Sequence, residues 1–211
     1  MGRLIEYISS NYLDILIQIR SHLLISLLAV LIACAIGIPL GYLASKSDRA
    51  EKIISTPFHL LRVIPSLAIL VVLIPIIGVG ELPAIIALTI LALPPVIVNT
   101  IVGFRTVPDF LKESAAGIGM NDNEIIRQIC IPLAMPMILA GIRTGMIEAI
   151  ASATLAAKIG AGGLGEIIFT GLGLNRMDLV ALGGILVAIL SLGCSLLFDR
   201  IGRVVVREGI R

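Results

Sequence analysis

The sequence predicts an all-α integral membrane protein: an amphipathic N-terminal helix, five transmembrane helices and one polar helix–turn–helix loop on the cytoplasmic side. Three observations predict this class. Of the 211 residues, 58% are hydrophobic and only 14% are charged, whereas soluble domains have roughly 25% charged residues. The mean hydropathy is +1.09. Five separate segments are apolar enough to cross a bilayer, because a spanning helix needs about 20 such residues.

The predicted elements follow one another without a soluble module, so we expect a single domain over residues 1–211. Residues 4–20 have apolar side chains at helical spacing, which predicts a helix lying at the membrane surface. Residues 53–62 form a half-polar approach to the second span. We expect the Pro94-Pro95 pair to kink the third span, because each proline removes a backbone donor. The predicted spans are roughly Leu23–Ala44, Val63–Val79, Leu82–Val102, Pro136–Ala157 and Leu179–Phe198.

The distribution of Lys and Arg predicts the orientation, because cytoplasmic loops carry an excess of these cations. One side of the membrane has ten of them: Lys46, Arg49, Lys52, Arg105, Lys112, Arg127, Arg200, Arg203, Arg207 and Arg211. The other side has four: Arg3, Arg20, Lys158 and Arg176. We therefore expect an external N-terminus, a cytoplasmic C-terminus and a cytoplasmic loop over residues 103–135.

This cytoplasmic loop contains start and stop signals for two short helices. Pro108 can begin the first helix, and Gly119 can terminate it with a left-handed cap. Asn121 can cap a second helix that has Glu124 at its third position, as in a capping box. We expect Pro132 to end this second helix before the fourth span.

The same loop resembles the EAA loop of ABC-importer permeases. That pattern is Glu-Ala-Ala, three residues, Gly, nine residues, Ile, any residue and Leu-Pro. The matching positions, with Ser for the first Ala and Ile131 for Leu, are Glu113, Ser114, Ala115, Gly119, Ile129 and Pro132. The resemblance implies that the loop, about residues 108–131, couples this chain to a cytoplasmic ATPase.

Further motifs resemble the osmoprotectant permeases, which carry quaternary amines such as glycine betaine, carnitine and choline. They are Arg62-Val-Ile-Pro-Ser-Leu, Asn99-Thr100, Ala140-Gly-Ile-Arg-Thr and Ile159-Gly-Ala-Gly-Gly-Leu-Gly. The resemblance implies the type I ABC-importer permease fold in the plasma membrane. It also implies a second permease subunit, as homodimer or heterodimer, an ATPase dimer and an external substrate-binding protein. Methionine-importer permeases share the loop and the Gly-rich turn and are the alternative.

Other functional classes lack their sequence signals. No Walker A pattern is present, so we expect a separate subunit to hydrolyse ATP and do not expect this chain to be an enzyme. Two His and three scattered Cys give no metal-ligand spacing, and we expect neither a metal nor a cofactor. No basic face with interleaved aromatics suggests a nucleic acid. An ion-coupled secondary transporter, with Glu148 as its coupling group, is a less favoured alternative.

Glu148 is a carboxylate near the middle of the fourth span, where a charge is costly and usually faces protein or water. Thr144, Glu148 and Ser152 share one helix face by their i, i+4 spacing. In one interpretation they line a translocation path together with Asn99 and attract a cation. In the other, Glu148 pairs with another buried polar group.

Small residues in two spans indicate close helix packing. In the first span these are Gly37 and Gly41, for which we expect packing within the subunit. In the fourth span they are Gly141 and Gly145, for which packing within the subunit and across a dimer both remain open.

A Gly-rich segment follows the fourth span, with glycines at Gly160, Gly162, Gly163 and Gly165. Its spacing matches a dinucleotide-binding pattern, but that site requires a βαβ unit, and here a membrane span precedes it. We predict instead a tight external turn between spans four and five, which shapes either the outer gate or the surface that receives a binding protein.

Overall fold

The computed structural model describes the backbone of residues 2–209 and the side chains of residues 4–204. Of the cations that indicate the orientation, Arg211 lies outside the described residues, as do the side chains of Arg3 and Arg207.

All regular elements of the described chain are helices, which confirms the predicted fold class. A π-turn covers Ile126–Cys130 and a 3-10 turn covers Ala157–Ile159, and no strand occurs between residues 2 and 209. The α-helices are α1 (Gly2–Ser10), α2 (Tyr12–Ser45), α3 (Asp48–Leu61), α4 (Ser66–Ile77), α5 (Glu81–Arg105), α6 (Asp109–Gly117), α7 (Asp122–Ile125), α8 (Ile131–Ala156), α9 (Gly165–Gly173) and α10 (Met177–Gly209).

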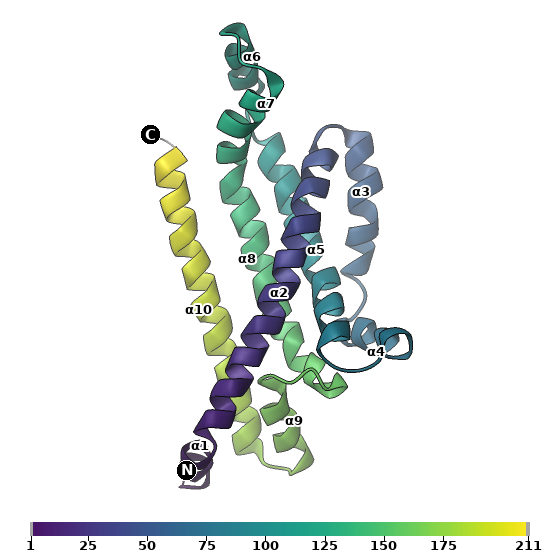
Figure 1. Ribbon diagram of the computed structural model, residues 1–211, viewed down its shortest axis with the longest axis vertical. Helices are drawn as coiled ribbons and strands as arrows, with labels where there is room; N and C mark the ends of the chain where they lie inside the picture. The colour runs from purple at the N-terminus through teal and green to yellow at the C-terminus, as the bar shows by residue number, and fades with distance from the viewer. Residues whose placement is uncertain (1, 210–211) are drawn as a thin grey trace.

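Four of these helices are long and apolar enough to cross a membrane, and the bent pair α3 and α4 gives a fifth span if the two count as one. The four are α2, α5, α10 and the continuous helix Asp122–Ile159, which includes α8. In Figure 1, α2, α5 and α8 lie side by side, with α10 on one flank and α3 on the other. Buried alanines fill the core between these three helices and let their backbones approach closely, among them Ala29, Ala33, Ala87, Ala92, Ala149 and Ala153.

The structure corrects the bounds of the second span, which the sequence placed roughly over Val63–Val79. The structure has α3 and α4 instead, and their axes differ by 92°. Pro65 explains the break, because it lacks an N–H and disfavours helical geometry at Ile64. Pro65 is the N-cap residue of α4, and its carbonyl accepts from the Ala68 N–H at 2.9 Å. A pair bent in this way is either a broken span or a re-entrant loop.

The prediction of one amphipathic surface helix over residues 4–20 is also wrong in its extent. The chain breaks at Asn11, whose side-chain amide donates to the Tyr7 carbonyl at 2.9 Å and ends α1. Residues 12–20 instead form the first part of the 34-residue helix α2. At about 1.5 Å per residue α2 is roughly 50 Å long, so it extends well beyond a hydrocarbon layer of about 30 Å.

The two short helices predicted within residues 103–135 form as expected. Helix α6 follows Pro108, and Gly119 then adopts φ +94°. The Asn121 side chain accepts from the Glu124 N–H at 3.1 Å, and the Glu124 carboxylate accepts from the Asn121 N–H at 2.8 Å, which completes the capping box.

Pro132 does not end the second helix, and this prediction is wrong. A continuous helix runs from Asp122 to Ile159 through α7, the π-turn and α8. The Ile131 N–H bonds the Ile126 carbonyl, five residues back, so the hydrogen-bonding register changes just before the proline that cannot donate. Likewise, α5 runs without interruption through Pro94-Pro95.

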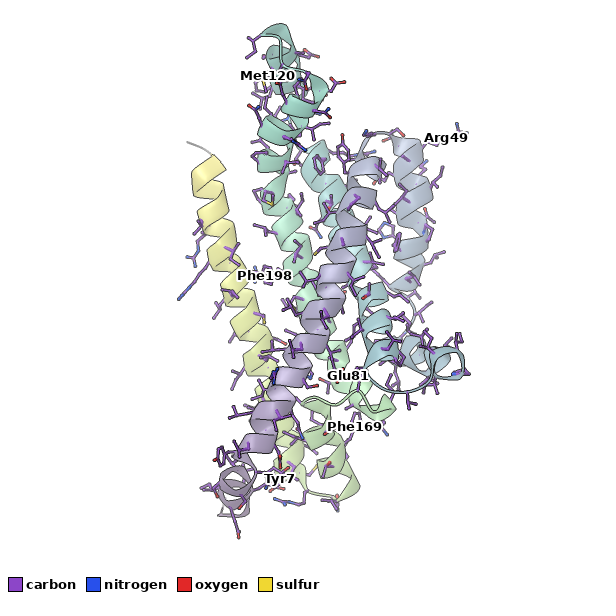
Figure 2. All side chains as sticks on the ribbon, viewed as in Figure 1. Tyr7, Arg49, Glu81, Met120, Phe169 and Phe198 are labelled. Carbon is purple, nitrogen blue, oxygen red and sulfur yellow. The ribbon has the colours of Figure 1, made fainter. Side chains whose placement is uncertain are left out.

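The two ends of the molecule differ in what they present. Helices α6 and α7 lie at one end together with the C-terminal part of α10, and α1 and α9 lie at the other (Figure 1). Figure 2 shows Arg49 and Met120 at the first end and Tyr7 and Phe169 at the second. The coupling loop and the Gly-rich turn are therefore separated by the full length of the helical bundle.

Candidate functional site

The coupling loop, residues 108–131, combines a fixed base with an open tip. Its base is an apolar cluster that includes Ala115, Ile125 and Cys130 and joins α6 and α7 to the end of α5 and the start of α8. Ile129 packs against this cluster, and Pro132 lies half-buried at the start of α8. These residues hold the loop on the end of the bundle.

The loop residues that face outward are a different subset. Glu113, Ser114 and Gly119 are exposed. Two large apolar side chains near them are also uncovered, Phe110 at 64% and Ile118 at 81%. Sequence reasoning missed this pair, although apolar residues inside a polar loop were the available signal. Exposed apolar side chains beside polar ones, outside the bilayer, are suited to contact with another protein.

The Glu148 side chain has a partner that the sequence did not reveal. Its Oε1 lies 3.1 Å from Nη2 of Arg62, which stands at the break between α3 and α4. The two side chains are 35% and 47% exposed, respectively. On the same face of α8, Thr144 is exposed and Ser152 is half-buried. The structure therefore brings these three α8 residues onto one open face and adds Arg62 to it.

Asn99 does not share that open face. Its side-chain amide donates to the Pro95 carbonyl at 2.8 Å, one turn back in α5, and its Cβ lies against Gly141 of α8. The side chain is half-buried between α5 and α8. Asn99 thus lies beside the helix that carries Glu148.

The glycines of the spans lie where helices come into close contact. A Cβ at Gly37 would lie 2.9 Å from Val96, and one at Gly41 would lie 2.6 Å from the Thr100 Cβ, so both pack α2 against α5 within this subunit. In α8, Gly141 and Gly145 also pack against α5, on the face that carries Ala92, Pro95 and Asn99. A Cβ at these two positions would lie 2.8 Å and 3.3 Å from the Pro95 and Ala92 carbonyl oxygens, respectively.

The Gly-rich segment forms a tight turn packed onto α2 and α8. Positive φ values of +77°, +75° and +83° occur at Gly160, Gly162 and Gly163. Gly165 lies so close to α8 that a Cβ there would overlap the Thr154 carbonyl. The Gly80 N–H donates to the Ile159 carbonyl at 2.7 Å, which connects the turn to the start of α5.

His22 holds this turn and was not identified from the sequence. Its Nδ1 accepts from the Leu164 N–H at 3.2 Å, and its Nε2 lies 2.9 Å from the Ile150 carbonyl of α8. These partners require a neutral ring with its proton on Nε2. A Cβ at Gly163 would lie 2.9 Å from Nδ1, so only glycine permits this approach. The side chain is 1% exposed.

A second polar contact fixes α10 to α8. Nε and Nη2 of Arg143 donate to the Ser195 hydroxyl at 3.0 and 2.7 Å, and its Nη1 pairs with the Asp199 carboxylate. No group of three or more His, Cys, Asp or Glu side chains within the described part of the chain is arranged to hold a metal.

The fold and these sites are consistent with a membrane-embedded transport subunit. The chain belongs to the family described as binding-protein-dependent transport system inner membrane component, whose model matches residues 37–208. This confirms the ABC-importer permease family predicted from the EAA loop.

The relatives of this chain include named osmoprotectant permeases. It is 44% identical over 192 residues to the carnitine transport permease protein OpuCB of Listeria monocytogenes, which covers 91% of this chain and 88% of that protein. It is 39% identical, with the same coverage, to the choline transport system permease protein OpuBB of Bacillus subtilis. A structure of the inward-facing MetNI methionine ABC transporter has a TM-score of 0.80 over 90% of this chain and 95% of that one. At 24% identity, that likeness shows the fold alone.

Proposed function

We propose that this chain is the permease subunit of an ATP-driven importer for a small osmoprotectant, a quaternary amine such as glycine betaine, carnitine or choline. The main support is the 44% sequence identity to a carnitine transport permease over 91% of the chain. It favours this substrate class over methionine, for which the likeness is one of fold at 24% identity.

High-affinity recognition of the solute belongs to a separate external binding protein. Quaternary ammonium groups are usually held in aromatic cages, and this chain has no Trp, three Tyr and five Phe. The permease itself provides a weak path. The face of α8 with Thr144, Glu148 and Ser152, flanked by Asn99, supports such a path because it is polar and the rest of the chain covers it only in part.

The coupling loop binds the ATPase dimer, and ATP is hydrolysed there rather than in this chain. Exposed Glu113 and Ser114 supply polar contacts, and Phe110 and Ile118 supply the apolar ones. Gly119 shapes the turn between α6 and α7, since its φ of +94° strains any residue with a Cβ.

The experiment is ATP-dependent uptake of glycine betaine by vesicles that contain the permease, its ATPase and its binding protein. Gly119→Val should leave the subunit in the membrane but uncouple ATP hydrolysis from uptake. Gly117→Ala is the matched control, because Gly117 is helical and a Cβ there meets nothing within 4 Å. Uptake without ATP would contradict the proposed importer. Unimpaired uptake by Gly119→Val would contradict the role of the turn.

The excess of Lys and Arg on one side of the membrane supports an external N-terminus and a cytoplasmic C-terminus. The subunit lies in the plasma membrane and pairs with a second permease subunit. An impermeant thiol reagent applied to intact cells tests this orientation in a variant without the three native cysteines. Leu174→Cys, in the 63% exposed position after α9, should react, and Arg49→Cys should not. The opposite pattern would invert the topology.

A further inference from the structure

The break between α3 and α4 places two opposite charges together where the chain does not cover them. The Arg62 guanidinium and the Glu148 carboxylate are 3.1 Å apart, and both side chains are partly exposed. Between residues 4 and 204 neither side chain has a second hydrogen-bond or ion-pair partner. The neighbouring Val63 is 80% exposed, so the surroundings of the pair are open as well.

The pair lies deep within the bundle rather than at a membrane surface. Glu148 lies 11 residues before Ile159, the outer end of the continuous helix, or about 16 Å along the axis. Charged groups at such depth are costly in contact with lipid and face protein or water instead. An exposed pair at this depth therefore faces an aqueous path or the second permease subunit.

The other sides of α8 are already occupied. Gly141 and Gly145 contact α5, and Arg143 binds α10. The remaining face carries Thr144, Glu148 and Ser152 at i, i+4 spacing. The Arg62–Glu148 pair is thus the charged centre of a polar stripe on α8 that the rest of the described chain covers only in part.

We propose that Arg62 and Glu148 together form a transient binding step for zwitterionic betaines, and this rests on the proposed function. The quaternary ammonium group of the solute takes the place of the guanidinium beside Glu148, and the solute carboxylate binds Arg62. The two charges of the protein separate when the solute arrives and pair again when it leaves. The step selects a molecule with both charges.

The chemistry of each group supports this division. A quaternary ammonium has no N–H, so it interacts with Glu148 through charge alone. A carboxylate can accept two parallel hydrogen bonds from the Arg62 guanidinium. Choline has the ammonium group without the carboxylate, so it would leave Arg62 unpaired and beside a like charge. Both protein side chains remain partly hydrated, which keeps the step weak enough for release.

The test compares uptake of glycine betaine and of choline by the reconstituted complex of permease, ATPase and binding protein. Arg62→Gln should lower glycine betaine uptake about fivefold, the scale of one partly hydrated charge pair, and leave choline uptake within about twofold. Glu148→Gln should lower the uptake of both solutes. Arg105→Gln is the control, because Arg105 pairs with Asp48 and Glu51 at the cytoplasmic end and should not change the ratio.

The double variant Arg62→Gln, Glu148→Gln keeps the test valid where a single variant fails to assemble. Two glutamine amides can bond each other in place of the ion pair, so the complex should assemble but lose its preference for glycine betaine over choline. A double variant with the wild-type ratio would overturn this inference while leaving the proposed function intact. A wild-type complex that takes up none of glycine betaine, carnitine and choline would overturn both.

Discussion

Replacement of His22 by Phe should loosen the Gly-rich turn without leaving a cavity in the core. Phe keeps an aromatic ring in the space between α2, α8 and the turn, but it can bond neither the Leu164 N–H nor the Ile150 carbonyl. His22 is 1% exposed and Leu164 is fully buried, so water cannot replace the lost partner of the Leu164 N–H.

The size of the effect follows from that orphaned donor. A buried N–H without a partner costs about 1–3 kcal/mol. The Ile150 carbonyl remains within helix α8, so the penalty is counted once. For a chain of this length, a loss of 1 kcal/mol lowers the melting temperature by roughly 2–4 °C, which gives a total decrease of about 2–12 °C.

The assay is thermal stability of the detergent-extracted subunit, together with amide exchange over residues 160–165, which should accelerate. Ser26→Ala is the matched control. Ser26 is fully buried in the same helix, but its hydroxyl donates to the His22 carbonyl within α2 at 2.8 Å, so its removal orphans no donor. An equal loss of stability in the two variants, or none in His22→Phe, would refute the reasoning.

Three further changes have defined outcomes. Gly41→Ala should lower the free energy of unfolding by about 1–3 kcal/mol, because the added Cβ overpacks the α2–α5 contact. Gly193→Ala should be neutral or stabilising by up to about 1 kcal/mol, because a Cβ there meets nothing within 4 Å. Thermal unfolding of the two variants measures the difference. Asn121→Ala removes the capping box and about 0.5–2 kcal/mol of helix stability, so amide exchange should accelerate in α7 and not in α6. Two glycines inserted after Cys130 should stop uptake while ATP hydrolysis continues, and the same insertion after Asn175, in the turn before α10, should leave uptake unchanged.

The elements that depend on local signals were predictable from the sequence. The loop helices begin and end where Pro108, Gly119 and Asn121 indicate, because a cap acts on backbone groups only a few residues away. The second span was not predictable by the same reasoning. Hydropathy is averaged over a window of residues, so the predicted span extended across Pro65, although this proline was the signal for the break between α3 and α4.

The contacts that join distant segments left little trace in the sequence. Arg62 and Glu148 are 86 residues apart in the chain, and only the bend between α3 and α4 brings them together. His22 bonds two backbone groups, which carry no sequence signature at all. The one indirect signal was Gly163, whose missing Cβ makes room for the ring, but its spacing was explained as a turn without reference to a partner.

The continuity of the helix from Asp122 to Ile159 explains why the distant sites of this subunit can depend on one another. This segment is 38 residues long, or about 57 Å. It begins within the coupling loop, carries Glu148 and ends just before the Gly-rich turn. Had Pro132 ended the helix, as the sequence suggested, a flexible joint would separate the loop from the span. Because the helix continues, a displacement of α7 has a direct mechanical route to Glu148. Such a displacement would change the contact of Glu148 with Arg62 and the contact of the Gly-rich turn with His22.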